Sequence, residues 1–216
     1  MSALPDIQFN NPFKECCSWT GQRQTGKTRG MANFIVANPN PMEIFDTLGV
    51  LGGMNLPLPK NVRIYKPSWV GKPLPDYDGR LPEFCSWCTK LWQRTHVIGV
   101  IEEWHLFNKT KFGLPAEFAN LMNQGGNYNI ALWGNSQRPA QCHNDILSGC
   151  KHHFIYNLGL PQDLRWMEKF IPDKKLISGD PKDPDSLCIA NLPPYHFLYY
   201  NMQTRQHDFY KPLKAY

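Results

Sequence analysis

The 216-residue sequence has no long apolar run, no large excess of one charge and no internal repeat. Because no stretch of about 18 apolar residues occurs, we expect no transmembrane helix. The first residues lack a basic and then apolar pattern, so we expect no signal peptide. The net charge of +5, from 23 Lys and Arg against 18 Asp and Glu, permits contact with nucleic acid without requiring it.

An even set of cysteines, as disulfide frameworks have, is also lacking: the seven cysteines are an odd number and are scattered along the chain. We therefore expect a reduced, intracellular protein. Cys85 and Cys88 form a single C-x-x-C pair, which packing in a core would explain. A zinc site needs four converging ligands, and no spacing fixes a second pair. The candidates for the other two zinc ligands are Cys142, His143, Cys150, His152 and His153.

The clearest pattern that is present runs from Gly21 to Thr28 and matches G-x-x-x-x-G-K-T, the phosphate-binding P-loop. Its glycines let backbone N–H groups turn toward phosphate oxygens at the positive end of the following helix. Lys27 is expected to contact the β and γ phosphates of ATP, and the Thr28 hydroxyl to ligate Mg²⁺. The predicted nucleotide-binding residues are Gly21, Gln22, Arg23, Gln24, Thr25, Gly26, Lys27 and Thr28.

The segments around this loop predict an α/β protein with the P-loop NTPase fold. Strands alternate with helices, which implies a mostly parallel central sheet flanked by helices. Residues 195–200 and 206–210 predict a C-terminal β-hairpin. We assign residues 1–12 to an N-terminal arm and 13–216 to a single ATPase domain. Strands are predicted at 13–20, 42–45, 62–65, 97–101, 129–135 and 153–156, helices at 28–38, 82–94, 115–123, 145–148 and 163–170, and a loop at 66–82.

Two apolar strands are followed by polar residues that suit phosphate chemistry. Glu102 and Glu103 follow residues 97–101, and we assign Glu102 to the magnesium shell and Glu103 to accepting a proton from the attacking water. The usual first residue of such a pair is Asp, and the alternative is a solvated acidic pair. Gln137 follows residues 129–135 and is expected to sense the γ-phosphate, with ordinary turn chemistry as its alternative.

Together these segments resemble the FtsK–HerA superfamily of P-loop DNA pumps. The matching pieces are residues 21–28, 97–103 and 129–139, and the compact form is similar to the genome-packaging ATPases of membrane-containing icosahedral viruses. The resemblance implies an ATP-driven ring of identical subunits, usually a hexamer, that pumps double-stranded DNA into a viral capsid. It places the protein in the host cytoplasm or the virion, and makes the C-terminal hairpin part of the core.

Members of that superfamily usually carry an arginine before the sensor strand, which reaches a neighbouring subunit's phosphates. Residues 124–127 contain none, so Arg138 is our candidate for this role and Arg165 the next; the alternative for Arg138 is an ion pair within its own subunit. Lys109 and Lys111 lie in the loop after the acidic pair and are candidate DNA contacts, with a solvated basic turn as the alternative.

Two other functions compete with DNA packaging. A morphogenesis or secretion ATPase similar to zonular occludens toxin would act on protein or on phage assembly, and such proteins commonly carry a membrane anchor. A P-loop kinase acting on a small molecule would need an arginine-rich lid, and residues 66–82 and 139–151 hold few arginines.

Overall fold

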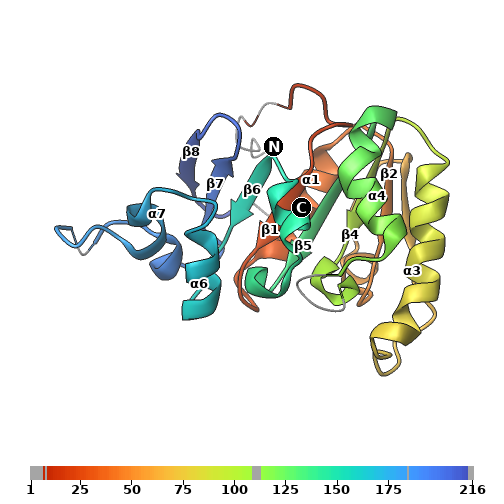
Figure 1. Ribbon diagram of the computed structural model, residues 1–216, viewed down its shortest axis with the longest axis horizontal. Helices are drawn as coiled ribbons and strands as arrows, with labels where there is room; N and C mark the ends of the chain where they lie inside the picture. Colours follow the sequence, from red (N-terminus) through yellow and green to blue (C-terminus); the bar gives the residue numbers. More distant parts are fainter. Residues whose placement is uncertain (1–6, 8, 109–112, 184, 214–216) are drawn as a thin grey trace.

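The computed structural model describes residues 7, 9–108, 113–183 and 185–213. In these residues eight strands form one sheet in the order β3-β2-β4-β5-β1-β6-β7-β8, with helices on both faces (Figure 1). The strands are β1 (Cys17–Thr20), β2 (Met42–Phe45), β3 (Val62–Tyr65), β4 (Val97–Ile101), β5 (Ile130–Ser136), β6 (His152–Ile155), β7 (Phe197–Asn201) and β8 (His207–Tyr210).

The sheet is mostly parallel, as predicted. Strands β1 to β6 pair in parallel, whereas β7 runs antiparallel to β6 and β8 antiparallel to β7. The α/β P-loop NTPase fold and the C-terminal β-hairpin are therefore confirmed. Because β1, β2, β4 and β5 run in the same direction, the polar segments that follow them lie at one edge of the sheet.

Alternating side chains of the buried strands belong to two hydrophobic cores, one on each face of the sheet. In β4, Val97 and Ile101 face one core, while Ile98 and Val100 face the other. Helix α1 packs on the second face, and α3 and α4 lie side by side on the first (Figure 1). The helices are α1 (Lys27–Ala37), α2 (Val50–Gly53), α3 (Tyr77–Trp92), α4 (Ala116–Gln124), α5 (Asn144–Ser148), α6 (Pro161–Met167) and α7 (Lys174–Ser178), with 3-10 turns η1 (Trp104–Phe107), η2 (Gly125–Tyr128), η3 (Pro139–Gln141) and η4 (Ile189–Asn191).

Helix α3 begins five residues earlier than the sequence suggested, so the end of the predicted loop 66–82 is wrong. The side chain of Asp76 caps the helix by accepting a hydrogen bond from the Gly79 N–H at 2.8 Å. Pro82 therefore lies inside the helix rather than at its start. The proline removes one backbone donor within the helix.

The described part of the N-terminal segment packs against the sheet. The Phe9 ring stacks on Trp133 with centroids 5.6 Å apart, and lies 4.7 Å from the ring of His152. Strand β1 starts at Cys17 rather than at residue 13, because residues 12–14 form a turn. Within the described residues, no helix has the length and apolar character needed to cross a membrane.

Candidate active site

The loop between β1 and α1 is held in place by backbone bonds to the neighbouring strand ends. The Gly21 N–H donates to the Ser136 carbonyl at 3.2 Å, and the Gln22 N–H to the Asn157 carbonyl at 3.0 Å. The Thr25 hydroxyl donates to the Gln22 carbonyl at 2.8 Å and closes the turn. Gly26 has φ of +102°, a conformation that strongly favours glycine. The two exposed residues of the loop are Arg23 and Gln24.

Helix α1 starts at Lys27 with Gly26 as its N-cap and no side-chain cap. The first N–H groups of an α-helix have no partner within the helix. Together with the Lys27 ammonium they form a set of donors that suits phosphate oxygens. The Thr28 hydroxyl, which accepts a hydrogen bond from Asn135 Nδ2 at 3.2 Å, offers an oxygen of the kind that Mg²⁺ prefers. The residues present therefore fit a triphosphate and its magnesium ion.

The loop meets the end of β4 through a buried ion pair. Lys27 Nζ lies 3.0 Å from Glu103 Oε1, and the two side chains are 7% and 4% exposed. Strand β5 lies between β1 and β4 in the sheet. The structure thus brings together the lysine and the carboxylate that the sequence assigned to phosphate binding and to proton transfer.

Residues at the end of β5 fix the orientation of Glu103. Asn135 Oδ1 accepts from the Glu103 backbone N–H at 2.6 Å, which holds Glu103 in a left-handed conformation with φ of +50°. Gln137 donates to both carboxylate oxygens, from its backbone N–H at 3.2 Å and from Nε2 at 3.0 Å. Gln137 therefore lies next to the carboxylate that the sequence assigned to proton transfer, and its own role as a phosphate sensor stays a prediction.

Glu102 contacts a different part of the chain from its neighbour. Its Oε2 accepts from the Leu48 N–H at 2.9 Å, and its carbonyl accepts from the Thr47 hydroxyl at 2.5 Å. Burial, with the nearby Asp46 carboxylate, raises the pKa of Glu102 to about 8. Among the described residues, no hydrogen bond or ion pair joins Glu102 to Lys27 or Thr28. The magnesium role of Glu102 stays a prediction.

His105 belongs to this site, although the sequence analysis did not select it. Its Nδ1 lies 3.3 Å from Glu103 Oε2 and 3.1 Å from Ser136 Oγ. Burial lowers the pKa of His105, against the opposing effect of the Glu103 carboxylate. A neutral imidazole with its proton on Nδ1 would donate to that carboxylate. The signal in the sequence was the position of His105, two residues after the predicted base.

Arg138 forms an ion pair within its own chain. Its Nε lies 3.0 Å from Asp163 Oδ2, and the other oxygen of this buried carboxylate accepts from the Ala140 N–H at 3.1 Å. This is the intramolecular alternative that the sequence left open. The Arg138 side chain stays 32% exposed, so a role toward a second subunit remains a prediction.

The remaining candidates from the sequence are the two lysines and the cysteine pair. The predicted DNA contacts Lys109 and Lys111 fall outside the described residues. Cys85 is half-buried and Cys88 buried on α3. Within the part of the chain that the structure describes, no group of three or more His, Cys, Asp or Glu side chains is arranged to hold a metal.

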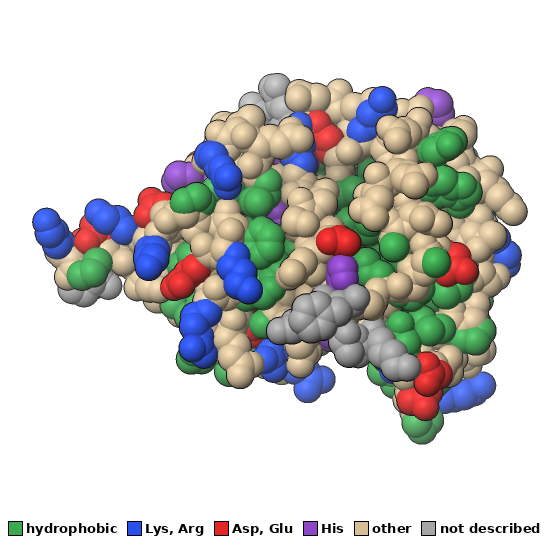
Figure 2. All heavy atoms as spheres, in the orientation of Figure 1, with side chains coloured by type: hydrophobic (Ala, Val, Ile, Leu, Met, Phe, Trp, Pro, Cys, Tyr) green, Lys and Arg blue, Asp and Glu red, His purple; other side chains and the backbone are tan. Residues whose placement is uncertain are grey.

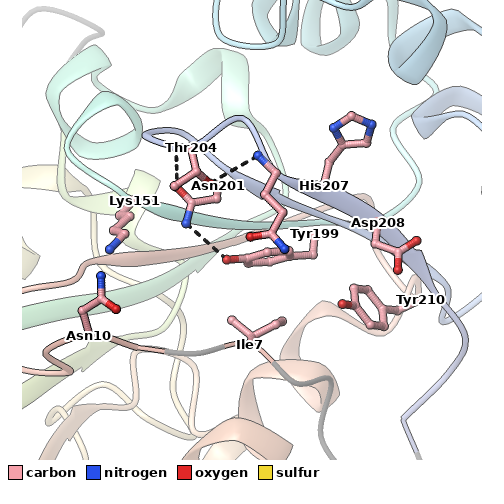
Figure 3. A pocket seen from close by; sticks show the side chains of 10 residues that line it. Ile7, Asn10, Lys151, Tyr199, Asn201, Thr204, His207, Asp208 and Tyr210 are labelled. Atoms are coloured by element: carbon pink, nitrogen blue, oxygen red, sulfur yellow. Dashed lines mark hydrogen bonds between the residues drawn. The ribbon is translucent and has the colours of Figure 1, made fainter.

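A separate hollow of about 470 Å³ lies between the N-terminal segment and the C-terminal hairpin (Figure 3). Ile7 and Asn10 line one side of it, and side chains of β7 and β8 line the other. It shares no lining residue with the loop 21–28 or with the end of β4. We therefore assign it no part in nucleotide binding.

The fold and the site together define a P-loop NTPase architecture, and known structures match it. The DNA-packaging ATPase B204 of Sulfolobus turreted icosahedral virus is 14% identical, with a TM-score of 0.71, over 94% of this chain and 100% of that chain. The genome-packaging NTPase B204 of Sulfolobus turreted icosahedral virus 2, in complex with ATP-gammaS, gives 14% identity and a TM-score of 0.69 over the same shares. EssC (ATPases 2 and 3) from Geobacillus thermodenitrificans gives 11% identity and a TM-score of 0.53 over 87% of this chain and 38% of that chain.

No family model matches the sequence, and neither does any curated protein. At 14% identity, the likeness to B204 shows the fold alone. In fold, the chain therefore resembles the B204 packaging ATPases, as the sequence suggested.

Proposed function

We propose that this chain is an ATPase that moves double-stranded DNA and packages a viral genome into a preformed capsid. The observation that carries the proposal is the pairing of Lys27 with Glu103, beside the sensor residue Gln137. A phosphate-binding lysine, a buried carboxylate and a neutral amide at adjacent strand ends are the groups that nucleoside triphosphate hydrolysis requires. The likeness in fold to B204 supports packaging as the use of that hydrolysis.

The chain's residues divide the chemistry among them. Lys27 and the first N–H groups of α1 would hold the phosphates, and Thr28 would hold Mg²⁺, whose charge offsets that of the phosphate oxygens. If the phosphates of the nucleotide attract Lys27, its ion pair with Glu103 would break, and Glu103 Oε1 would be free of the lysine. Glu103 then accepts a proton from the attacking water, while Gln137 and His105 keep its carboxylate oriented.

The assembly we propose is a ring of identical subunits, a hexamer by analogy with DNA pumps, acting at the packaging vertex in the host cytoplasm or on the virion. In it, residues 13–216 form one ATPase domain and residues 1–12 an arm. Arg138 would reach a neighbour's phosphates only after leaving Asp163, so formation of the ring would exchange one partner of this arginine for another.

DNA contact is assigned to Lys109 and Lys111, which follow the acidic pair in the sequence. On the face shown in Figure 2, the Lys and Arg side chains over α6 and α7 have acidic side chains among them. One such pair joins Lys175 Nζ to Asp180 Oδ2 at 2.7 Å. Mixed charges of this kind give little attraction for a phosphate backbone.

The test is ATP hydrolysis measured with and without double-stranded DNA. We expect hydrolysis that DNA stimulates, and a fall of roughly a hundredfold or more in Glu103→Gln with ATP binding retained. Hydrolysis that is unaffected by DNA would favour the alternative that the ATPase acts on protein. A folded Glu103→Gln variant with wild-type turnover would show that the active site is elsewhere.

A further inference from the structure

Tyr195 lies directly against the phosphate-binding loop. Its backbone N–H donates to the Thr25 carbonyl at 3.0 Å. Its ring is so close to Gly26 that a Cβ atom added there would lie 2.6 Å from Tyr195 Cδ1. Gly26 therefore gives the loop its turn and also makes room for the tyrosine ring.

Tyr195 is nevertheless 46% exposed. Tyr195 also has φ of +65°, a conformation that costs free energy for a bulky residue. The segment before it is tied to the loop from a second side, because Asn157 Nδ2 donates to the Ala190 and Leu192 carbonyls at 3.2 and 3.1 Å. The Asn157 carbonyl itself holds the Gln22 N–H. The contacts thus hold an exposed aromatic ring at the mouth of the loop.

The order of the strands gives the direction in which a bound nucleotide would extend. Glu103 and Gln137 follow β4 and β5, on one side of β1. Tyr195 precedes β7, which lies on the other side of β1, beyond β6. If the terminal phosphate of a nucleotide on the loop faces Glu103, the other end of the nucleotide extends toward the opposite side of β1. Its base therefore points toward Tyr195.

We propose that Tyr195 is the nucleobase contact of this site and stacks on the base of the bound nucleoside triphosphate. The inference rests on the proposed function and adds the way in which the site recognises the nucleoside. Every base has a π-face, so stacking on tyrosine tolerates all four bases. The site would then take nucleoside triphosphates as a class, and the phosphates and the base would bind to separate parts of the chain.

The experiment compares binding of ATP with binding of inorganic tripolyphosphate, both with Mg²⁺, because tripolyphosphate lacks the base. The variants are Tyr195→Phe, which keeps the ring, and Tyr195→Gly, which removes it and suits the positive φ. Tyr128→Ala is the matched control, because Tyr128 is a similarly exposed tyrosine, 50% exposed, in η2. Isothermal titration on the full chain gives both dissociation constants.

We expect Tyr195→Gly to bind ATP roughly tenfold more weakly or worse, with tripolyphosphate affinity unchanged. Tyr195→Phe and Tyr128→Ala should match the wild type with both ligands. Equal losses for ATP and tripolyphosphate in Tyr195→Gly would mean that the tyrosine only supports the loop, and would overturn the proposal. Unchanged ATP affinity would overturn it as well. A wild-type chain that binds neither ligand would refute the phosphate site itself, and the base contact with it.

Discussion

Lys27 and Glu103 form an ion pair 3.0 Å long at the centre of the site, and both side chains are almost completely buried. Each charge has lost most of its hydration, so each depends on the other for compensation. Removing one partner of such a pair typically costs about 3–5 kcal/mol, because the remaining charge stays buried. The pair therefore links the stability of the site to its chemistry.

The first prediction concerns Lys27→Ala. Judged from the sequence, this change should abolish hydrolysis and leave the fold intact, because the lysine serves the ligand. The buried pair adds a second effect: the variant should also lose free energy of unfolding, measured by urea denaturation. The double variant Lys27→Ala, Glu103→Gln should recover part of the lost free energy of unfolding, since neither charge of this pair then remains buried. A double variant no more stable than Lys27→Ala would contradict the coupling.

The second prediction concerns pH and Glu102. Burial and the neighbouring Asp46 raise the pKa of Glu102 to about 8 from a usual value of 4.5, so the folded chain holds a proton that the unfolded chain releases between these values. The stability from Glu102 is fully present below its unfolded pKa, and is lost as the pH rises through its folded pKa. The loss has a slope of up to about 1.4 kcal/mol per pH unit.

Glu102→Gln imitates the protonated acid and is the control for that measurement. It should remove the slope, and it should leave the magnesium requirement of hydrolysis unchanged because Glu102 faces Leu48 rather than Thr28. Denaturation curves from pH 5 to 9, at constant salt, compare the two proteins. A raised magnesium requirement would support the metal role that the sequence suggested.

The third prediction concerns His105 as a positioning residue for Glu103. Asparagine can place an N–H close to the Nδ1 position, whereas alanine cannot. We expect His105→Ala to lower the turnover number by about tenfold, much less than loss of the base itself, with ATP affinity unchanged. His105→Asn should restore most of the rate. Equal losses in the two variants, or a parallel loss of ATP binding, would indicate a purely structural role.

The sequence predicted the phosphate loop, the parallel sheet and Glu103, because each depends on local spacing or on the end of an apolar strand. It did not separate the directions of Glu102 and Glu103, since that difference arises from the left-handed backbone of Glu103 and its bond to Asn135. Tyr195 and Asp163 could not be assigned either. They reach Gly26 and Arg138 only through contacts between segments far apart in the chain.

The fourth prediction tests the proposed DNA contacts. Changing both Lys109 and Lys111 to Ala should weaken DNA binding equally for all sequences. It should reduce the slope of log affinity against log salt by roughly two, about one for each phosphate contact. Lys174 and Lys175 changed to Ala provide a control with the same loss of charge on α7, where acidic residues lie nearby. Slopes that shrink equally in both double variants would show only an effect of net charge.

We propose that hydrolysis at Glu103 moves the protein along double-stranded DNA. Release of a fluorescent third strand from a DNA triplex measures that movement directly, because a protein advancing along the duplex strips the third strand away. We expect release that requires ATP in the wild type, and no release in Lys27→Ala or Glu103→Gln. ATP hydrolysis stimulated by bound DNA, with the third strand still in place, would contradict it.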